Sequence, residues 1–507
     1  MRALPKGWAE VELGEVWHES RARARPDAIT RTDYIGLEHV EGGTNRITGA
    51  GRSDGVKSAV AVFSEGDVLY GRLRPYLNKV IRPSFAGVAS TEFLVFKESQ
   101  ALVNGLLMRL LSSSDLVAYA SANSAGVNLP RISAKRLAEY RFGLAPLPEQ
   151  HRIVAKIESL FARLDEGVAA LKRAETNLER YRASVLKAAV EGRLTEEWRR
   201  ENPPAETGED LLRRILAERR KRWEAEQLAK FEANGRKPPR NWRAKYKEPV
   251  APDTSGLRGL PEGWCWATVD QVGKVGSGIT KGGKKRDAIR RAVPYLRVAN
   301  VQRGRLDLRV IKTIFASDAE IRRYSLKSGD VLFNEGGDRD KLGRGWVWSG
   351  GLAECLHQNH VFRVRPFLRD YPSEFLSHYG NSAGQEWFFR RATQSVNLAS
   401  INQTVLRSLP VPLPPLREQQ HIVRRLADEL GSAEAAGTEF TRQLSRATIL
   451  RQSILKSAFE GRLVPQDPAD EPASVLVDRI RAERAAERNR RKRRPSQRKR
   501  QPKSRVP

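Results

Sequence analysis

The sequence predicts an α+β protein in which two similar mixed α/β domains are joined by two long helices. We expect the helices to form an antiparallel intramolecular coiled coil with pseudo-twofold symmetry. Two observations predict this fold: an internal duplication and a heptad pattern that closes each copy. Val127-Asn128-Leu129 recurs as Val396-Asn397-Leu398, 269 residues later. A repeat this long is not a solenoid repeat, because one copy is large enough to bury its own core.

The duplication covers most of both copies. Its offset stays constant toward the end of each copy and drifts upstream, so the front parts of the two copies have diverged. The other matched segments are Leu4-Pro5 with Leu260-Pro261, Gly7-Trp8 with Gly263-Trp264, Gly66-Asp67-Val68-Leu69 with Gly329-Asp330-Val331-Leu332, Glu149-Gln150 with Glu418-Gln419, and Glu191-Gly192-Arg193-Leu194 with Glu460-Gly461-Arg462-Leu463. Two copies of one structural unit on one chain favour a molecule with pseudo-twofold symmetry.

Residues 1–147 form the first predicted domain, because short apolar stretches alternate with Gly, Ser and Asn turns. Residues 148–194 form the first predicted long helix. Its apolar residues recur every seven positions at Ile157, Leu164, Leu171, Leu178 and Val185. A heptad pattern of this length predicts a helix of roughly 43 residues, or ~65 Å.

Residues 415–463 form the second predicted long helix, and their apolar positions are Leu426, Ala433, Phe440, Ala447 and Ile454. Prolines precede both helices, and Gly192 and Gly461 stand where a C-cap glycine belongs. Each apolar stripe is too long to leave in water. Packing one helix against the other, antiparallel, buries both stripes and fits the pseudo-twofold symmetry.

The remaining segments separate and follow these parts. Residues 195–258 form a charged spacer with a helical pattern from Glu209 to Lys230, followed by a linker rich in Pro and Gly from Asn234 to Gly259. Residues 259–414 form the second predicted domain. Residues 464–507 begin with a helical pattern, and we expect the basic, low-complexity tail after Arg488 to be disordered.

Charge indicates what the domains bind. The chain has 90 Lys and Arg against 60 Asp and Glu, a formal net charge of +30. A balance this basic is typical of nucleic-acid-binding proteins. The two cysteines make no disulfide framework, no apolar run is long enough for a membrane span, and no signal-peptide core is present. We therefore expect a cytoplasmic protein with no membrane partner.

Two segments resemble nucleotide or cofactor motifs, and each has a simpler interpretation. Gly278–Lys285 approximates a phosphate-binding loop, but Lys285 stands where Ser or Thr would bind magnesium. A basic loop that faces nucleic acid is the favoured alternative. Asn202-Pro203-Pro204 resembles an adenine-methyltransferase motif, but Ala205 replaces its aromatic residue and no Gly-rich cofactor loop precedes it. A linker is the favoured alternative there.

Two clusters could be drawn as metal sites. Cys355, His357 and His360 have a spacing that could supply three zinc ligands, but a fourth is not evident, so we expect no metal. A second cluster of three acids, Glu335, Asp338 and Asp340, lies among glycines and basic residues and is more typical of a loop that follows phosphates than of a nuclease. We predict no catalytic residues and no cofactor in this chain.

The repeated motifs together resemble the DNA-specificity subunit of type I restriction-modification systems. Two variable domains, each followed by a Pro-Leu-x-Glu-Gln helix and a Glu-Gly-Arg-Leu exit, carry the resemblance over nearly the whole chain. The supporting segments are Tyr34–Glu38, Gly66–Tyr70 and Leu73–Lys79 in the first domain, and Pro294–Gln302, Gly329–Gly337 and His357–His360 in the second. The spacer after Arg193 and the basic tail exceed the pattern of that family.

The resemblance implies a non-catalytic subunit that reads double-stranded DNA and holds two adenine methyltransferase subunits on its helices. Restriction translocase-nuclease subunits would join them, and S-adenosylmethionine, ATP and magnesium would belong to those partners. Because the two domains differ, we expect an asymmetric, bipartite target. The alternative is a nucleic-acid-binding coiled-coil scaffold without sequence specificity, which would leave the diverged loops without a purpose.

In either domain, basic side chains would hold phosphates, and polar or aromatic side chains would contact base edges. The residues predicted to hold phosphates are Arg72, Arg74, Lys79, Lys281, Lys284, Lys285, Arg339, Lys341 and Arg344. The residues predicted to contact bases are Tyr76, Asn78, Asn334, Gln358, Asn359 and His360.

Overall fold

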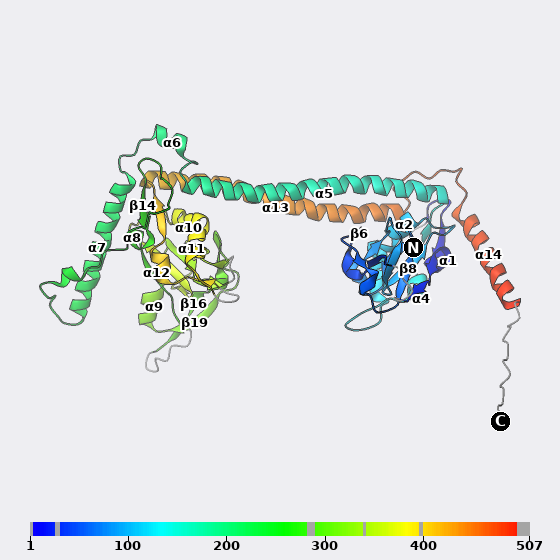
Figure 1. Cartoon of the computed structure of the whole chain (residues 1–507), viewed down its shortest axis with the longest axis horizontal. Coiled ribbons are helices and arrows are strands. Elements are labelled where there is room, and N and C mark those ends of the chain that lie inside the picture. The colour runs from blue at the N-terminus through cyan, green and yellow to red at the C-terminus, as the bar shows by residue number, and fades with distance from the viewer. Residues whose placement is uncertain (1–3, 26–30, 281–288, 338–340, 395–398, 494–507) are drawn as a thin grey trace, which may run out of the picture. The chain divides into compact units, whose positions relative to one another are not determined.

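The computed structural model describes residues 4–25, 31–280, 289–337, 341–394 and 399–493 (Figure 1). The chain divides into two compact units. Unit 1 comprises Met1–Lys172 and Phe440–Pro507, and unit 2 comprises Arg173–Glu439. Each unit therefore contains one mixed α/β domain and a part of both long helices, which confirms the predicted fold class.

Unit 1 is built on two sheets that share a core. The four-stranded antiparallel sheet has the order β10-β9-β12-β2, and the five-stranded mixed sheet has the order β3-β8-β11-β4-β7. Leu69 and Phe93 face the core between the sheets, whereas Val68 and Leu94 face the helices. Because successive strand residues point to opposite sides, the four-stranded sheet is covered on both faces.

The elements of unit 1 have the following bounds. The strands are β1 Ala9–Glu12, β2 His18–Ser20, β3 Arg23–Ala24, β4 Asp33–Ile35, β5 Val40–Glu41, β6 Arg46–Ile47, β7 Gly51–Arg52, β8 Val60–Phe63, β9 Val68–Gly71, β10 Val80–Ile81, β11 Gly87–Ser90, β12 Phe93–Lys97 and β13 Arg141–Leu144. The helices are α1 Leu13–Val16, α2 Asn104–Leu111, α3 Ser114–Ala122, α4 Ala134–Ala138 and α14 Ala473–Arg493, with 3-10 turns η2 Leu37–His39, η3 Ser53–Gly55 and η4 Pro75–Leu77.

Unit 2 has its main antiparallel sheet in the order β15-β24-β20-β22, beside a mixed sheet β19-β16-β23. Its repeated strand β20 also alternates: Val331 and Phe333 enter one core and Leu332 the other. The repeated Gly-Asp at the start of this strand makes the same turn in both units. Asp67 accepts from Ser64 N at 2.8 Å, and Asp330 accepts from Lys327 N at 2.7 Å.

The elements of unit 2 have the following bounds. The strands are β14 Cys265–Thr268, β15 Gly273–Gly276, β16 Arg291–Leu296, β17 Val301–Gln302, β18 Arg305–Leu306, β19 Lys312–Ala316, β20 Asp330–Asn334, β21 Gly336–Gly337, β22 Gly345–Trp348, β23 Leu356–His357, β24 Val361–Pro366, β25 Thr393–Gln394, β26 Ala399–Ser400 and β27 Pro410–Leu413. The helices are α6 Glu196–Glu201, α7 Gly208–Ala233, α8 Val269–Val272, α9 Asp318–Tyr324, α10 Ser373–Asn381, α11 Ala383–Arg391 and α12 Gln403–Arg407, with 3-10 turns η5 Trp242–Lys245 and η6 Val298–Asn300.

The two long helices are α5, Leu147–Val190, and α13, Leu416–Phe459, each of 44 residues. In unit 1, Ile153 and Ile157 near the start of α5 share a buried core with Ile454 and Ala458 near the end of α13. In unit 2, Val185 and Ala189 near the end of α5 share a core with Ile422 and Leu426 near the start of α13. Within each unit the helices therefore run antiparallel (Figure 1).

The repeated motifs meet at one joint in each unit. In unit 1, Trp8 donates from Nε1 to Glu149 at 3.0 Å, and Gly461 lies directly against Pro5 and Trp8. In unit 2, Trp264 donates to Glu418 at 2.8 Å, and Gly192 lies against Pro261 and Trp264. The start of one long helix and the end of the other are thus fixed to the same domain, which explains why these distant motifs repeat together.

Gly192 and Gly461 end the helices with φ of 73° and 67°, as the C-cap prediction requires. The expected linker from Asn234 to Gly259 differs from the prediction. Its Trp242 is buried and stacks on Trp223 of α7, with ring centroids 5.8 Å apart. A Pro- and Gly-rich composition marks irregular backbone, but the aromatic side chains still bury enough surface to order part of it.

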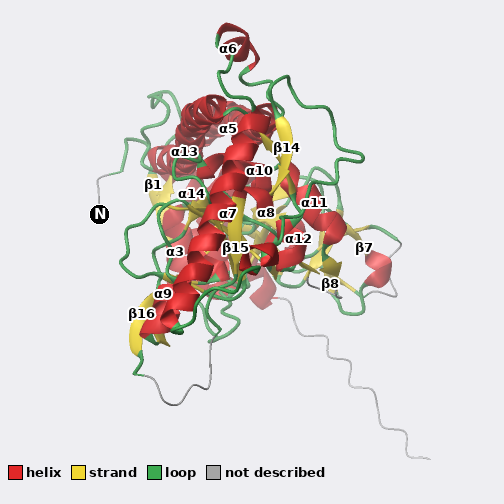
Figure 2. Ribbon diagram, turned by 90° about the vertical axis from the view of Figure 1, so that its left-hand side faces the viewer, coloured by secondary structure: helices red, strands yellow, loops and turns green. Residues whose placement is uncertain are grey.

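The helix before the basic tail also continues further than expected. Helix α14 runs to Arg493, five residues past Arg488, and residues 494–507 lie outside the described residues. It contacts α1 in unit 1. In the same way α7 contacts α8 in unit 2, and Figure 2 shows these two helices side by side.

Candidate nucleic-acid interface

In unit 1, two loops lie together and present exposed side chains. Arg74 N donates to Pro130 O at 2.7 Å, and Ile132 N donates to Arg72 O at 3.1 Å. We call residues 72–78 and 125–132 the first loop pair. Arg74 and Asn78 both have left-handed backbones, with φ of 51° and 50°, on either side of the 3-10 turn η4. This tight turn displays Tyr76, whose exposed fraction is 54%.

The predicted residues of this segment divide into two groups. Arg74 and Tyr76 are exposed at the surface of the first loop pair. The other three hold the fold: Arg72 pairs with Glu92 at 3.4 Å, Asn78 donates to Ser112 O at 3.0 Å, and Lys79 donates to Leu37 O at 2.6 Å. The structure therefore leaves Arg74 and Tyr76 better placed for a ligand than Arg72, Asn78 and Lys79.

The first loop pair also contains residues that the sequence-based prediction missed. Val127 is 98% exposed, and Leu129 beside it is exposed as well. Arg131 pairs with Glu92 at 2.9 Å, next to Arg72. The repeated Val-Asn-Leu was the available signal, but it was used only to define the duplication. Exposed apolar side chains next to arginines are suited to a partner that carries both apolar groups and negative charge.

In unit 2, three segments converge on the turn between β23 and β24. Asn359 N donates to Ile279 O at 3.0 Å, and Glu335 N donates to His360 O at 3.0 Å. The His360 Nδ1 is in contact with the Glu335 carboxylate, and Ile401 N donates to Glu335 O at 2.8 Å. We call Gln358–His360 with Glu335–Gly337 the second loop cluster. Here the structure brings together three of the predicted base-contacting residues.

Asn334, the neighbour of Glu335, does not belong to this surface. It is fully buried, and its amide donates to Val301 O at 2.9 Å and to Val298 O at 3.3 Å. Its prediction as a base-contacting residue is corrected to a structural role, because the amide satisfies backbone carbonyls under the loop. Lys341 and Arg344 lie half-buried on the segment that returns to β22. Lys281, Lys284, Lys285 and Arg339 lie outside the described residues.

His357, one of the three candidate zinc ligands, already has a structural partner. His357 is buried, and its Nδ1 must carry the proton that it donates to Val361 O at 2.7 Å, because a carbonyl can only accept. Burial lowers the pKa of His357 to about 3, and the nearby charges of Arg363 and Arg365 act in the same direction. Among the described residues, no group of three His, Cys, Asp or Glu side chains is placed to hold a metal ion. Gly278 packs against the His357 carbonyl, where a Cβ would overlap it.

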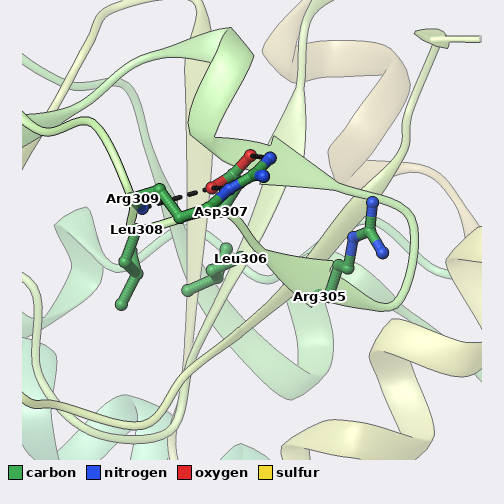
Figure 3. Close-up of a pocket in the computed structure, with 5 residues that line it drawn as sticks. All are labelled: Arg305, Leu306, Asp307, Leu308 and Arg309. Carbon is green, nitrogen blue, oxygen red and sulfur yellow. Dashed lines mark hydrogen bonds and ion pairs between the residues drawn. The ribbon is translucent and has the colours of Figure 1, made fainter. Parts of the chain in front are cut away.

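Residues Arg305–Arg309 line a surface hollow in unit 2 (Figure 3). Arg309 donates to the Asp307 carboxylate from Nε at 2.9 Å and from Nη2 at 2.6 Å. These hydrogen bonds lower the pKa of Asp307 to about 2. The hollow is formed by one short segment whose acid is already paired, and it contains no predicted contact residue.

The fold thus defines a duplicated, strongly basic α+β protein in which each domain presents a loop cluster and is fixed to a pair of long helices. No helix among the described residues is long and apolar enough to cross a membrane.

Residues 261–431 match the family model of the type I restriction modification DNA specificity domain. The chain is 26% identical over 419 residues to the Escherichia coli type I restriction enzyme EcoKI specificity subunit, covering 80% of this chain and 75% of that one. It is 25% identical over 500 residues to the E. coli EcoDI specificity subunit, covering 95% and 96%. Residues 261–431 thus match a type I restriction modification DNA specificity domain, and the chain as a whole is similar to type I specificity subunits, as the repeated motifs predicted.

Two solved structures share the fold. One, described as the structural basis underlying complex assembly and conformational transition of the type I R-M system, matches with a TM-score of 0.66 at 21% identity, over 91% of this chain and 100% of that one. The other, the HsdS subunit from Thermoanaerobacter tengcongensis, matches with a TM-score of 0.53 at 19% identity, over 91% of this chain and 98% of that one.

Proposed function

We propose that this chain is the sequence-specific double-stranded DNA recognition subunit of a type I restriction-modification complex. One observation carries the proposal: both units keep the same joint of Trp, Glu and Gly, but their surface loops differ in sequence and structure. A scaffold that binds DNA without specificity needs no such divergence. In this proposal, residues 1–147 and 259–414 are the two target-recognition domains.

Each loop cluster contacts one half of a bipartite target. In unit 1, Arg74 holds phosphate and Tyr76 contacts base edges, with the apolar Val127 and Leu129 suited to thymine methyl groups. In unit 2, Gln358, Asn359 and His360 offer amide and imidazole groups for base-edge hydrogen bonds. The high positive charge of the chain supplies the sequence-independent part of the affinity. Because the clusters differ, the half-sites are different from each other.

The long helices set the spacing of the half-sites and hold the partner subunits. A 44-residue helix is about 66 Å long. On the unit 1 part of the pair, Leu164, Val168 and Leu171 of α5 and Ala447 and Leu450 of α13 line an apolar groove. A two-helix coil leaves such a stripe half-exposed, and additional helices from a partner would cover it.

The partners proposed for the helices are two adenine methyltransferase subunits, with restriction translocase-nuclease subunits joining them. In this assembly, S-adenosylmethionine, ATP and magnesium bind to the partners. The chain itself supplies target recognition and no catalytic residue.

The test is to assemble the chain with its methyltransferase subunit and map methylated adenines. We expect the double variant Tyr76→Ala/Arg74→Ala to tolerate more bases in one half-site. The double variant Gln358→Ala/His360→Ala should tolerate more bases only in the other half-site. Phe315→Ala is the matched control, because this exposed residue of β19 lies outside both loop clusters. Methylation that follows no common motif, or loop variants that leave both half-sites unchanged, would contradict the proposal.

A further inference from the structure

Helix α7 and the segment after it form a folded projection of unit 2, which we call the α7 arm, residues 208–247. After α7 ends, the chain turns back, and an aromatic cluster fixes the return. Trp242 stacks on Trp223 with centroids 5.8 Å apart, Phe231 meets Trp242 edge-on at 6.3 Å, and Tyr246 meets Trp223 edge-on at 5.2 Å. The end of the arm is therefore ordered by its own side chains.

The root of the arm is fixed to unit 2. Leu211 and Ile215 are fully buried in the core of the domain, and Gly208 N donates to Gly263 O at 2.7 Å. Lys274 of β15 pairs with Glu226 at 2.6 Å. An arm held at its root and folded at its end keeps its charges in place, which lowers the entropy lost when they bind a partner.

The end of the arm, residues 230–247, is strongly basic. It contains seven basic residues and one acid, Glu232. All seven are exposed: Lys230, Arg236, Lys237, Arg240, Arg243, Lys245 and Lys247. Among the described residues, only Arg243 of these seven forms an ion pair, with Glu224 at 3.3 Å. Along α7 before residue 230, by contrast, Arg214 pairs with Glu206 at 2.9 Å and Arg222 pairs with Glu218 at 2.8 Å.

Unit 1 carries a counterpart at the equivalent place. Ala473 N, at the start of α14, donates to Gly7 O at 2.8 Å, and Gly7 is the repeat partner of Gly263. Arg481 of α14 pairs with Glu15 at 3.1 Å. The sequence after Arg484 is again basic. Both copies of the duplication thus attach a helix with a basic continuation to the same loop of their domain, although the two continuations have different sequences.

We propose that the α7 arm binds the DNA phosphate backbone through the exposed basic residues of its end. Uncompensated positive charges repel one another, and DNA phosphates relieve this repulsion while releasing counterions. Contacts to phosphates carry no base information, so they add affinity without changing the sequence that is read. The inference rests on the proposed function as a DNA-binding subunit but assigns a separate surface from the loop clusters.

The test uses the full chain, assembled with its methyltransferase subunit, on a duplex with the mapped target and on a scrambled duplex. The variant R236A/K237A/R240A/K245A removes four exposed charges outside the aromatic cluster. The control R236K/K237R/R240K/K245R keeps all four charges at the same positions. We expect the alanine variant to bind both duplexes at least about tenfold more weakly and its log Kd against log salt slope to fall by up to about 3.6, since each phosphate contact contributes about 0.9. The control should bind like the parent chain.

Three results would overturn the inference. The alanine variant could keep the parent's affinity and salt slope. It could lose affinity for the target alone, which would assign base reading to the arm. It could bind DNA normally but no longer assemble with the methyltransferase subunit, which would make the arm a docking surface for an acidic protein. A parent complex that does not distinguish target from scrambled DNA would instead contradict the proposed function, while equal losses on both duplexes would still support the arm.

Discussion

Trp264 donates its indole N–H to the Glu418 carboxylate across 2.8 Å, and both side chains are buried. Glu418 also accepts from Thr195 Oγ1 at 2.7 Å and from Arg199 Nη1 at 2.6 Å. The repeat partner of this carboxylate, Glu149, accepts from Trp8 and from Gln466 Nε2 at 3.3 Å. Only Glu418 has an arginine in direct contact, because Arg152 in unit 1 pairs with Asp470 instead.

This difference predicts that replacing each glutamate by glutamine destabilises the two units by unequal amounts. Glu418→Gln leaves the largely buried Arg199 guanidinium without its counter-charge, and we expect the free energy of unfolding of unit 2 to fall by about 3 kcal/mol. Glu149→Gln keeps an acceptor for Trp8 and removes a carboxylate whose pKa burial already raises, so we expect a loss of about 1 kcal/mol in unit 1. Hydrogen exchange of the helix ends would measure both. Equal losses would show that Arg199 contributes nothing to the joint.

The C-cap glycines provide a second matched pair. Gly192 has φ of 73°, and a Cβ there would lie 2.6 Å from Pro261 Cγ. Gly461 has φ of 67°, and a Cβ there would lie closer still to Pro5 Cγ. We expect Gly192→Ala and Gly461→Ala each to cost more than about 1 kcal/mol, because the left-handed backbone and the proline contact act together. Gly235→Ala, with φ of 62° but open space around it, isolates the backbone part. Thermal unfolding that ranks Gly235→Ala as the most damaging of the three would contradict the role of the proline contact.

Two buried histidines make unit 2 sensitive to acid. Burial lowers the pKa of His357 to about 3 and that of His378 to about 4. The unfolded chain binds these protons below about pH 6.5, whereas the folded chain does not, so stability falls as the pH drops from about 6.5 to 4. Each histidine contributes up to about 1.4 kcal/mol per pH unit in this window.

The urea midpoint of the unit 2 transition, measured from pH 7 to pH 4, checks this prediction. His378 makes an edge-on contact with Trp346, with ring centroids 5.0 Å apart. His378→Phe keeps an aromatic ring there but removes one titrating group, so the urea midpoint should depend less on pH. A parent chain whose unit 2 transition does not move over this range would contradict it.

The parts of the structure that could be predicted follow regular spacing. The heptads located both long helices, and the repeated Gly after each helix located its end, because helix geometry imposes these periods on a single sequence. The joint could be recognised as a repeated motif, but its contacts could not be predicted. Trp8, Glu149 and Gly461 lie far apart in the sequence, and no local pattern shows that they meet.

The loop residues were harder to assign for a physical reason. A polar side chain after a strand can face a ligand or satisfy backbone groups of its own domain, and the sequence looks the same in both cases. Asn334 and Asn78 donate to backbone carbonyls, whereas Tyr76 and His360, chosen by the same reasoning, are exposed. Trp242 was assigned to a linker because the Pro and Gly residues around it indicate irregular backbone. The sequence does not show that its side chain is buried.

The last prediction tests whether the long helices set the spacing of the half-sites. Inserting four residues into each helix, between Leu171 and Leu178 and between Phe440 and Ala447, adds ~6 Å and ~400° of rotation. The apolar stripes then shift by only ~40°, so the helix pair should survive. At ~3.4 Å per base pair, the spacer should lengthen by one or two base pairs while the bases of both half-sites stay the same. Methylation mapping of the assembled variant measures this. A folded, active complex that kept the original spacer would show that the helices do not set the distance.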